Sequence, residues 1–200
     1  MKKNKPKFKQ IIDAAVEVIA ENGYHSSQVS KIAKKAGVAD GTIYLYFKNK
    51  EDILVSLFQE KMGQFIEKIE QETTSRQSAD EKLHTLIHTH FEQLAADHHL
   101  AIVTQLELRQ SNKDLRQKIN NVLKRYLNVI DQIVDEGVEE GLFRNGLDRR
   151  LVRQMIFGMM DETVTNWVMK DQRYNIVDQA SEVHSLIIYG LARNREEEER

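Results

Sequence analysis

The sequence predicts an all-α protein, and three observations support this fold class. Apolar residues recur at helical spacing along most of the 200-residue chain, without a convincing strand, hairpin signal or internal repeat. A single proline and nine glycines allow long, unbroken helices. Hydrophobic residues make up 40% and charged residues 30% of the chain, as expected for a globular protein large enough to bury a core.

The first helix is expected from Pro6, a residue that suits a first helical turn, to about Glu21, where Asn22-Gly23 ends it. Ser27 is expected to cap the second helix, because its hydroxyl can accept a bond from a free backbone N–H. The later helices are expected at about 29–36, 40–47, 50–73, 83–94 and 102–109, then from 115 to an end near 137–141, and finally at 149–170 and 177–191, with Asp148 capping the one that ends near 170.

We expect three parts: a head of residues 1–50, a body of residues 51–192 and a charged tail of residues 193–200. The helix at 50–73 is too long for a three-helix head and is expected to join head and body. Residues 1–5 are expected to be a disordered basic arm. The head carries ten lysines and four acids, a net +6, whereas the other 150 residues carry −8. This asymmetry indicates that only the head meets a polyanion, although a solvated basic tail would give the same total.

Residues 29 to 48 have the pattern of a helix-turn-helix. The small Ala33 allows the second helix to cross closely over the first. Gly37 supplies the positive φ that the tight turn needs, and Val38 and Ile43 fill the angle between the two helices. The second helix of such a pair is free to lie in a DNA major groove.

The composition argues against several other classes. Zero cysteines exclude disulfides, thiolate metal sites and a cysteine nucleophile, and fit a cytoplasmic protein. No apolar window approaches a membrane span, and the lysine-rich start resembles no secretory signal, so we expect no membrane partner. No G-x-S-x-G elbow or glycine-rich phosphate loop is present, so we expect no catalytic residues, no enzyme activity and no cofactor.

A metal site is the weakest of the alternatives. His84 and His88 are four residues apart, a spacing that can hold a metal, and His90 is nearby. No third ligand is compelling, and the H-E-x-x-H pattern is missing, so ordinary histidines are the preferred interpretation and we expect no metal.

The flanks make the helix-turn-helix more specific. Gly23-Tyr24 precedes it, and G-T-I-Y-L-Y-F at 41–47 is followed by K-E-D-I-L at 50–54. Residues 11–54 together resemble the N-terminal domain of TetR-family repressors. The resemblance implies binding to double-stranded operator DNA, with phosphate contacts from the short hydroxyl of Thr42 and base contacts from Tyr44. The expected DNA-binding residues are Ser27, Gly41, Thr42, Tyr44, Tyr46 and Lys50.

The sequence departs from the family pattern at the start of the recognition helix. Ala39 stands where Ser is common, and Asp40 places an acid on a surface meant for DNA. Asp40 either caps the helix, which we favour, or accepts a bond from a cytosine amino group. The alternative to DNA contact for Tyr44 and Tyr46 is that both are packed aromatic residues. Lys31, Lys34 and Lys35 are equally consistent with a solvated face and with DNA contacts.

Two stretches of the body, Q-L-E-L-R-Q-S-N at 105–112 and F-G-M-M-D-E-T-V-T-N-W at 157–167, are similar to the fatty-acid-degradation (FadR-type) repressors within that family. The resemblance implies that long-chain acyl-CoA, or the fatty acid, binds the body as an effector and releases DNA. Unbranched methionines suit a wall that moulds around an acyl chain, and Arg109 suits a thioester oxygen or a phosphate. The expected ligand-binding residues are Phe91, Leu94, Val103, Leu106, Arg109, Met155, Met159, Met160 and Trp167.

Other interpretations of the body remain open. The same residues are compatible with an ordinary Met- and Phe-rich core in which Arg109 pairs with a distant acid. A repressor of this kind can also respond to a drug or another hydrophobic molecule. A small helical enzyme acting on acyl thioesters is a third possibility, against which the missing nucleophile and base argue.

The last two helices carry more apolar surface than one buried face each requires, so we expect a homodimer formed by two-fold packing of four helices. The expected dimer residues are Leu151, Val183, Leu186 and Ile187. Such a dimer would hold two recognition helices about one DNA turn, roughly 34–36 Å, apart.

Overall fold

The computed structural model describes residues 6–191, and the regular elements within that range are all helical, which confirms the predicted fold class. The predicted basic arm, residues 1–5, and charged tail, residues 193–200, lie outside the described residues. The chain forms two compact units, one of residues up to Gln64 with Asp97–Leu123, the other of Phe65–Ala96 with Lys124 onward. The division into head and body at residue 50 stays a prediction.

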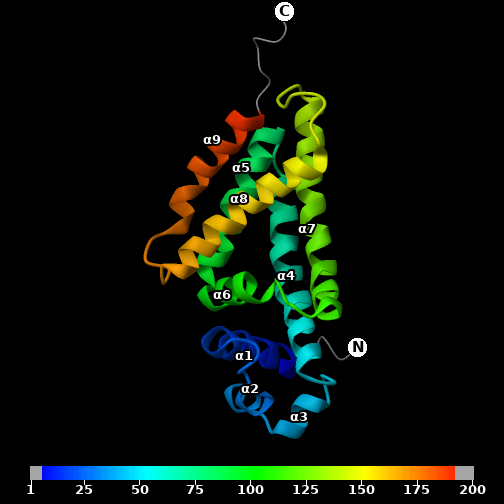
Figure 1. Ribbon diagram of the computed structural model, residues 1–200, viewed down its shortest axis with the longest axis vertical. Helices are drawn as coiled ribbons and strands as arrows, with labels where there is room; N and C mark the ends of the chain where they lie inside the picture. The colour runs from blue at the N-terminus through cyan, green and yellow to red at the C-terminus, as the bar shows by residue number, and fades with distance from the viewer. Residues whose placement is uncertain (1–5, 192–200) are drawn as a thin grey trace, which may run out of the picture. The chain divides into compact units, whose positions relative to one another are not determined.

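The first unit contains the predicted helix-turn-helix (Figure 1). Its elements are α1 (Pro6–Asn22), α2 (Val29–Lys35), α3 (Asp40–Tyr44), α6 (His98–Glu107) and the first parts of α4 (Lys50–Thr74) and α7 (Lys113–Glu139). Helix α1 packs against α2 and α6, and α2 packs against α3. Helix α3, the predicted recognition helix, therefore packs on α2, and α2 packs on α1.

Apolar side chains of α1 form the centre of this unit. Ile11, Ile12 and Ala15 are completely buried, and the ring of Phe8 stacks on that of Phe47 with centroids 5.3 Å apart. Burying one isoleucine or phenylalanine side chain contributes about 1.5–3 kcal/mol. This core fixes the chain just after α3 to the first turn of α1.

The turn between α2 and α3 forms as predicted. Gly37 has a φ of +62°, and the Val38 N–H donates to the Ala33 carbonyl at 3.0 Å. Ile43, the one fully buried side chain of α3, closes the angle between the two helices. Helix α3 is shorter than predicted, ending at Tyr44 and not at residue 47. The N–H groups of the next two residues bond carbonyls three positions back, so the helix tightens into a turn.

Two predicted caps are wrong. Helix α2 is capped by Gln28 without a side-chain bond, and the Ser27 hydroxyl instead donates to the carbonyls of Val18 and Gly23 at 3.1 and 2.7 Å. Asp40 is the first residue of α3, and its N-cap, Ala39, offers no side-chain acceptor. Ser27 closes the loop after α1 because a buried hydroxyl donates to the carbonyls nearest to it, each of which has two lone pairs.

The second unit is a separate helical bundle. It contains α5 (Ala79–Ala96), α8 (Arg149–Met169), the 3₁₀-helix η1 (Ile176–Gln179), α9 (Ala180–Leu191) and the remaining parts of α4 and α7. Helix α9 packs against both α5 and α8, and η1 packs against α5 and α9 (Figure 1). Asp148 accepts bonds from the N–H groups of Arg150 and Leu151 at the start of α8, which confirms the predicted cap.

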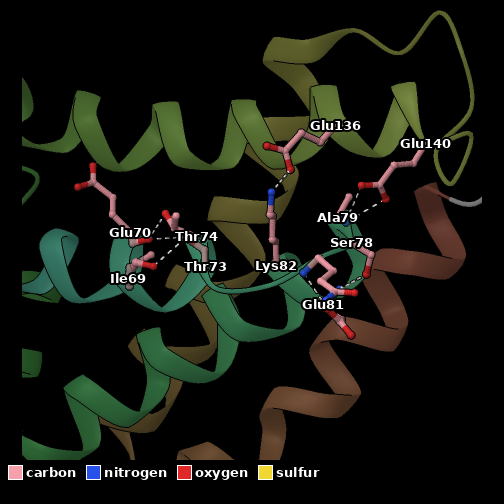
Figure 2. Close-up of polar contacts among 11 residues, drawn as sticks. Ile69, Glu70, Thr73, Thr74, Ser78, Ala79, Glu81, Lys82, Glu136 and Glu140 are labelled. Carbon is pink, nitrogen blue, oxygen red and sulfur yellow. Dashed lines mark hydrogen bonds and ion pairs between the residues drawn. The ribbon is translucent and has the colours of Figure 1, made fainter.

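The start of α5 is held by acidic side chains. Ser78 accepts from the Glu81 N–H, and the Glu81 carboxylate accepts from the Gln77 N–H, a variant of the capping box in which the second bond comes from the residue before the N-cap. Figure 2 shows Glu140, near the end of α7, reaching the Ala79 N–H, and Glu136 pairing with Lys82. The polar break between α4 and α5 is therefore a structured junction.

Candidate functional site

Helix α3 presents a small exposed surface, which we call the recognition surface: Gly41, Thr42 and Tyr44. Tyr44 is 58% exposed, whereas its neighbour Ile43 is completely buried. Thr42 is partly exposed, and Gly41 has no side chain to hold a partner away. The side chains thus separate as predicted, with the apolar one facing the core and the polar ones facing outward. The contacts that they make with DNA stay a prediction.

Tyr46 lies at the edge of this surface and is partly buried. The centroid of its ring is 6.5 Å from the ring centroid of Phe8 and 6.4 Å from that of Phe47. Tyr46 therefore packs on the core with one part of its ring and remains partly accessible, as a phosphate contact requires.

The ammonium group of Lys50 is already bound within the head. It donates to the carbonyls of Tyr24 and His25, both at 3.0 Å, and lies 4.6 Å from the centre of the Tyr24 ring. An ammonium has three N–H groups, so two of them fix the loop before α2 to the start of α4. Lys50 thus positions the loop before α2 in this structure, and its third N–H is not needed for that role.

Ser27 is 1% exposed, with its hydroxyl hydrogen and its N–H used inside the head. It is not part of the DNA surface that we propose below. Lys35 pairs with Glu17 at 2.5 Å and Lys31 donates to Asn22 at 3.2 Å, whereas Lys34 is exposed. Asp40 is exposed beside the recognition surface, so the cytosine contact predicted as its second role is sterically open.

A buried acid links α6 to the head. Glu107, at the end of α6, is 8% exposed, and its Oε1 accepts from the Tyr24 N–H at 2.8 Å. Its other oxygen accepts from the side chain of Gln110, which is also buried. Because the Tyr24 carbonyl binds Lys50, a single residue of the α1–α2 loop connects the end of α6 to the start of α4.

The predicted ligand-binding residues fall in both units. Val103, Leu106 and Arg109 belong to the first unit, where Val103 is buried and the other two are exposed. The rest belong to the second unit: Phe91, Leu94, Met160 and Trp167 are buried, Met159 is half-buried and Met155 is 52% exposed. The Trp167 indole N–H donates to the Tyr174 carbonyl at 2.7 Å, which ties α8 to the loop after it.

Inside the second unit a polar pair is enclosed by aromatic rings. His90 Nδ1 lies 2.9 Å from the Tyr126 hydroxyl, which is also 3.9 Å from the sulfur of Met160. The ring of Phe65 meets that of His90 edge-on at 5.2 Å. Burial lowers the pKa of His90 to about 3, so its imidazole is neutral at physiological pH.

The other two histidines, whose spacing was weighed as a metal site and not preferred, lie elsewhere on α5. The rings of His84 and His88 stack with centroids 6.3 Å apart, and both residues line an open, polar cleft between α4 and α5 of about 450 Å³. Burial, followed by the nearby His184, lowers the pKa of His84. Among the described residues, no three His, Cys, Asp or Glu side chains are grouped so that they could hold a metal ion.

The predicted dimer residues separate into two kinds. Leu151 and Leu186 are each 54% exposed, whereas Val183 and Ile187 are buried within the chain itself, on the helix that packs against α5. Tyr189 of α9 is 83% exposed. An apolar surface on α8 and α9 is therefore available to a second subunit. The exposed residues of this surface, Leu151, Leu186 and Tyr189, are the ones able to contact that subunit directly.

In the part of the chain that the structure describes, none of the helices combines the length and the apolar character that a membrane crossing requires.

The helix-turn-helix with an exposed α3 defines a protein of the DNA-binding regulator class. Two family models match the chain: "Bacterial regulatory proteins, tetR family" over residues 11–57, and "YsiA-like protein, C-terminal region" over residues 58–190. The chain therefore belongs to the TetR family of bacterial transcriptional regulators, as the sequence motif predicted.

The relatives point to one branch of that family. The fatty acid metabolism regulator protein of Bacillus subtilis (strain 168) is 65% identical over 191 residues, which cover 96% of this chain and 98% of the relative. A crystal structure of the B. subtilis regulator FadR in complex with stearoyl-CoA is 66% identical, with a TM-score of 0.89 over 92% of this chain and 99% of that one. FadR from Bacillus halodurans gives 63% identity and a TM-score of 0.88, again covering 92% of this chain and 99% of that one.

The roles of four residues in these sites were not predicted from the sequence: Tyr24, Glu107, His90 and Tyr126. Tyr24 and Glu107 are 83 positions apart, so nothing local indicates that they meet. A histidine in an otherwise apolar stripe, as His90 is between Ile87 and Phe91, was the available signal for the buried pair.

Proposed function

We propose that this protein is a dimeric transcriptional repressor that binds operator DNA and releases it on binding long-chain acyl-CoA, so that genes of fatty acid degradation are expressed when acyl-CoA accumulates. In this proposal the acyl-CoA is an effector and not a cofactor, the chain carries out no catalysis, and it acts in the cytoplasm.

The similarity to the B. subtilis regulator carries this proposal. That protein is named for fatty acid metabolism, and FadR from the same organism is described in complex with stearoyl-CoA. The similarity extends over nearly the full length of both chains, so it includes the body as well as the head. The body is where a ligand pocket would lie between helices, and the few polar groups of such a pocket decide its ligand.

The proposed division of labour puts DNA recognition within residues 1–50 and the effector and dimer functions within residues 51–192. In the head, Tyr44 is the best-placed side chain to touch base edges, because it is the exposed aromatic of α3. Thr42 and Tyr46 would contact phosphates. Lys50 supports binding by holding the loop at Tyr24 against the start of α4.

Binding energy for the effector would come from the acyl chain. Each methylene taken out of water contributes about 0.8 kcal/mol, so a long chain supplies the several kcal/mol needed to shift a two-state dimer when it is buried only in the state that releases DNA. A short chain supplies little. The buried Phe91, Leu94, Met160 and Trp167 are the apolar side chains that we propose for this role in the second unit.

Dimerisation would use the exposed apolar residues of α8 and α9, Leu151 and Leu186 among them. Covering this surface removes apolar area from water and places two α3 helices on one face of DNA. The effector acts if it favours a dimer in which that spacing is wrong.

A competition experiment tests the function. Purified protein is bound to fluorescently labelled operator DNA and titrated with CoA, with acyl-CoAs of increasing length and with one lipophilic dye. Release by long acyl-CoA, with free CoA inactive and short chains weak, supports the proposal. Release by the dye, with no dependence on chain length, would instead support a repressor that responds to drugs or other hydrophobic molecules.

A further inference from the structure

His90 is a buried histidine with only one of its two ring nitrogens bonded. Nδ1 pairs with the Tyr126 hydroxyl at 2.9 Å. Nε2 is shielded from solvent and has no hydrogen-bond partner among the described residues. A buried polar group without a partner is costly and rare in folded proteins, so such a group calls for a functional explanation.

The partner of Nδ1 decides which nitrogen carries the proton. The Tyr126 hydroxyl has one hydrogen and two possible acceptors, His90 Nδ1 at 2.9 Å and the Met160 sulfur at 3.9 Å. An imidazole nitrogen is a much stronger acceptor than a thioether sulfur. Tyr126 therefore donates to Nδ1, and the hydrogen of the neutral ring lies on Nε2, which makes Nε2 an unused donor.

The surroundings of this donor are apolar and aromatic. The rings of Phe65 and Phe91 lie 5.2 and 5.8 Å from the His90 ring, and Phe157 lies 6.0 Å from the Tyr126 ring. Met160, completely buried, completes the group with an adaptable side chain. One N–H donor in an apolar enclosure is the arrangement that orients a largely apolar ligand by a single polar atom.

We propose that His90 Nε2–H donates a hydrogen bond to the thioester carbonyl oxygen of the acyl-CoA effector, with Tyr126 fixing the tautomer that makes this possible. This inference rests on the proposed function, since it presumes an acyl thioester ligand. It adds a specificity-determining residue that distinguishes a thioester from other molecules with the same long chain.

The charge of the site favours a neutral acceptor. Burial first, and then the carboxylate of Asp161, raise the pKa of the Tyr126 hydroxyl, so Asp161 acts electrostatically on Tyr126. A fatty acid would bring a second carboxylate into the same apolar enclosure, where an unpaired charge is costly. The thioester carbonyl accepts the same hydrogen bond without a charge, so the site selects the activated form of the fatty acid.

A thioether analogue tests the proposal. Stearoyl-CoA and S-octadecyl-CoA have the same chain length and the same CoA portion, but the analogue has a methylene in place of the carbonyl. Wild-type protein should bind stearoyl-CoA about 5- to 150-fold more tightly than the analogue, the range that one hydrogen bond to a buried donor supports. In His90→Leu, which removes the donor, the two ligands should bind equally.

The possible outcomes distinguish a failure of the proposed role of His90 from a failure of the proposed repressor function. If wild-type protein releases DNA with stearoyl-CoA but does not distinguish it from the thioether, the function stands and the role of His90 is wrong. If His90→Leu still binds stearoyl-CoA more tightly than the thioether, the role of His90 is likewise wrong. If neither ligand releases DNA, the proposed function itself fails.

A spectroscopic measurement covers the case in which His90→Leu does not fold. The carbonyl of ¹³C-labelled stearoyl-CoA should shift to lower infrared frequency on binding to wild-type protein, as a hydrogen-bonded carbonyl does. His90→Gln, which keeps an N–H donor, should retain a part of this shift. A bound carbonyl that absorbs at the frequency of an unbonded thioester would overturn the proposal.

Discussion

Replacing Glu107 by alanine is the perturbation whose effect the structure defines most closely. Glu107 accepts from the Tyr24 N–H at 2.8 Å and from the side chain of Gln110, and all three residues are buried. Glu107→Ala leaves two buried donors without acceptors, each at a cost of about 1–3 kcal/mol. Because the Gln110 side chain can turn to another partner, we expect a total loss of about 2–4 kcal/mol, a large part of the 5–15 kcal/mol typical of a domain.

Two measurements check this expectation. Urea unfolding followed by circular dichroism gives the loss of stability, and amide hydrogen exchange at Tyr24 gives its location, since about 2 kcal/mol speeds local exchange roughly 30-fold. Glu107→Gln keeps an oxygen for the Tyr24 N–H and should lose less than about 1.5 kcal/mol. Unchanged protection of the Tyr24 amide in Glu107→Ala would refute the argument. Operator affinity should also fall in Glu107→Ala, because Tyr24 holds Lys50.

Three further predictions follow from the exposed and buried groups described above. Tyr44→Ala should reduce the ratio of operator to random-DNA affinity, measured by fluorescence anisotropy, because a lost base contact costs about 1–3 kcal/mol of discrimination; an unchanged ratio would exclude Tyr44 from readout. Leu151→Glu with Leu186→Glu should give folded monomers by light scattering, since both side chains are exposed in the subunit; a stable dimer would place the interface elsewhere. Below pH 6.5 His90 becomes protonated in the unfolded chain but not in the native chain, where its pKa is about 3. The free energy of unfolding therefore decreases as the pH is lowered. Wild type should lose up to about 1.4 kcal/mol per pH unit more than His90→Leu between pH 6.5 and 4.5, and parallel curves would contradict this.

Much of the fold follows from local patterns that the sequence displays. The stripe of α1, the positive φ at Gly37 and the cap at Asp148 depend on residues within a few positions of one another, and each was predicted. Caps with competing partners were not predicted correctly. Ser27 has a hydroxyl that suits an N-cap, but two carbonyls of the preceding segment are nearer once the loop is buried.

The candidate sites were predictable only where they are local. Helix α3 carries its own surface, so Tyr44 could be named from the motif and its neighbours. The bond from Tyr24 to Glu107 and that from His90 to Tyr126 join residues 83 and 36 positions apart, and depend on helix packing that no local pattern encodes. For the same reason, Val183 and Ile187 could not be separated from Leu186, because the stripe of α9 does not reveal which side faces α5.

The role of acyl-CoA as effector is tested by the concentration of acyl-CoA that releases half of the operator DNA, measured as a function of acyl chain length. We expect that free CoA has no effect and that this concentration falls as the chain lengthens, since each added methylene contributes up to about 0.8 kcal/mol. Trp167, buried in the second unit, should report the same binding through its fluorescence. If no acyl-CoA releases DNA at micromolar concentration, the effector assignment is contradicted, and only the DNA-binding TetR-family regulator remains.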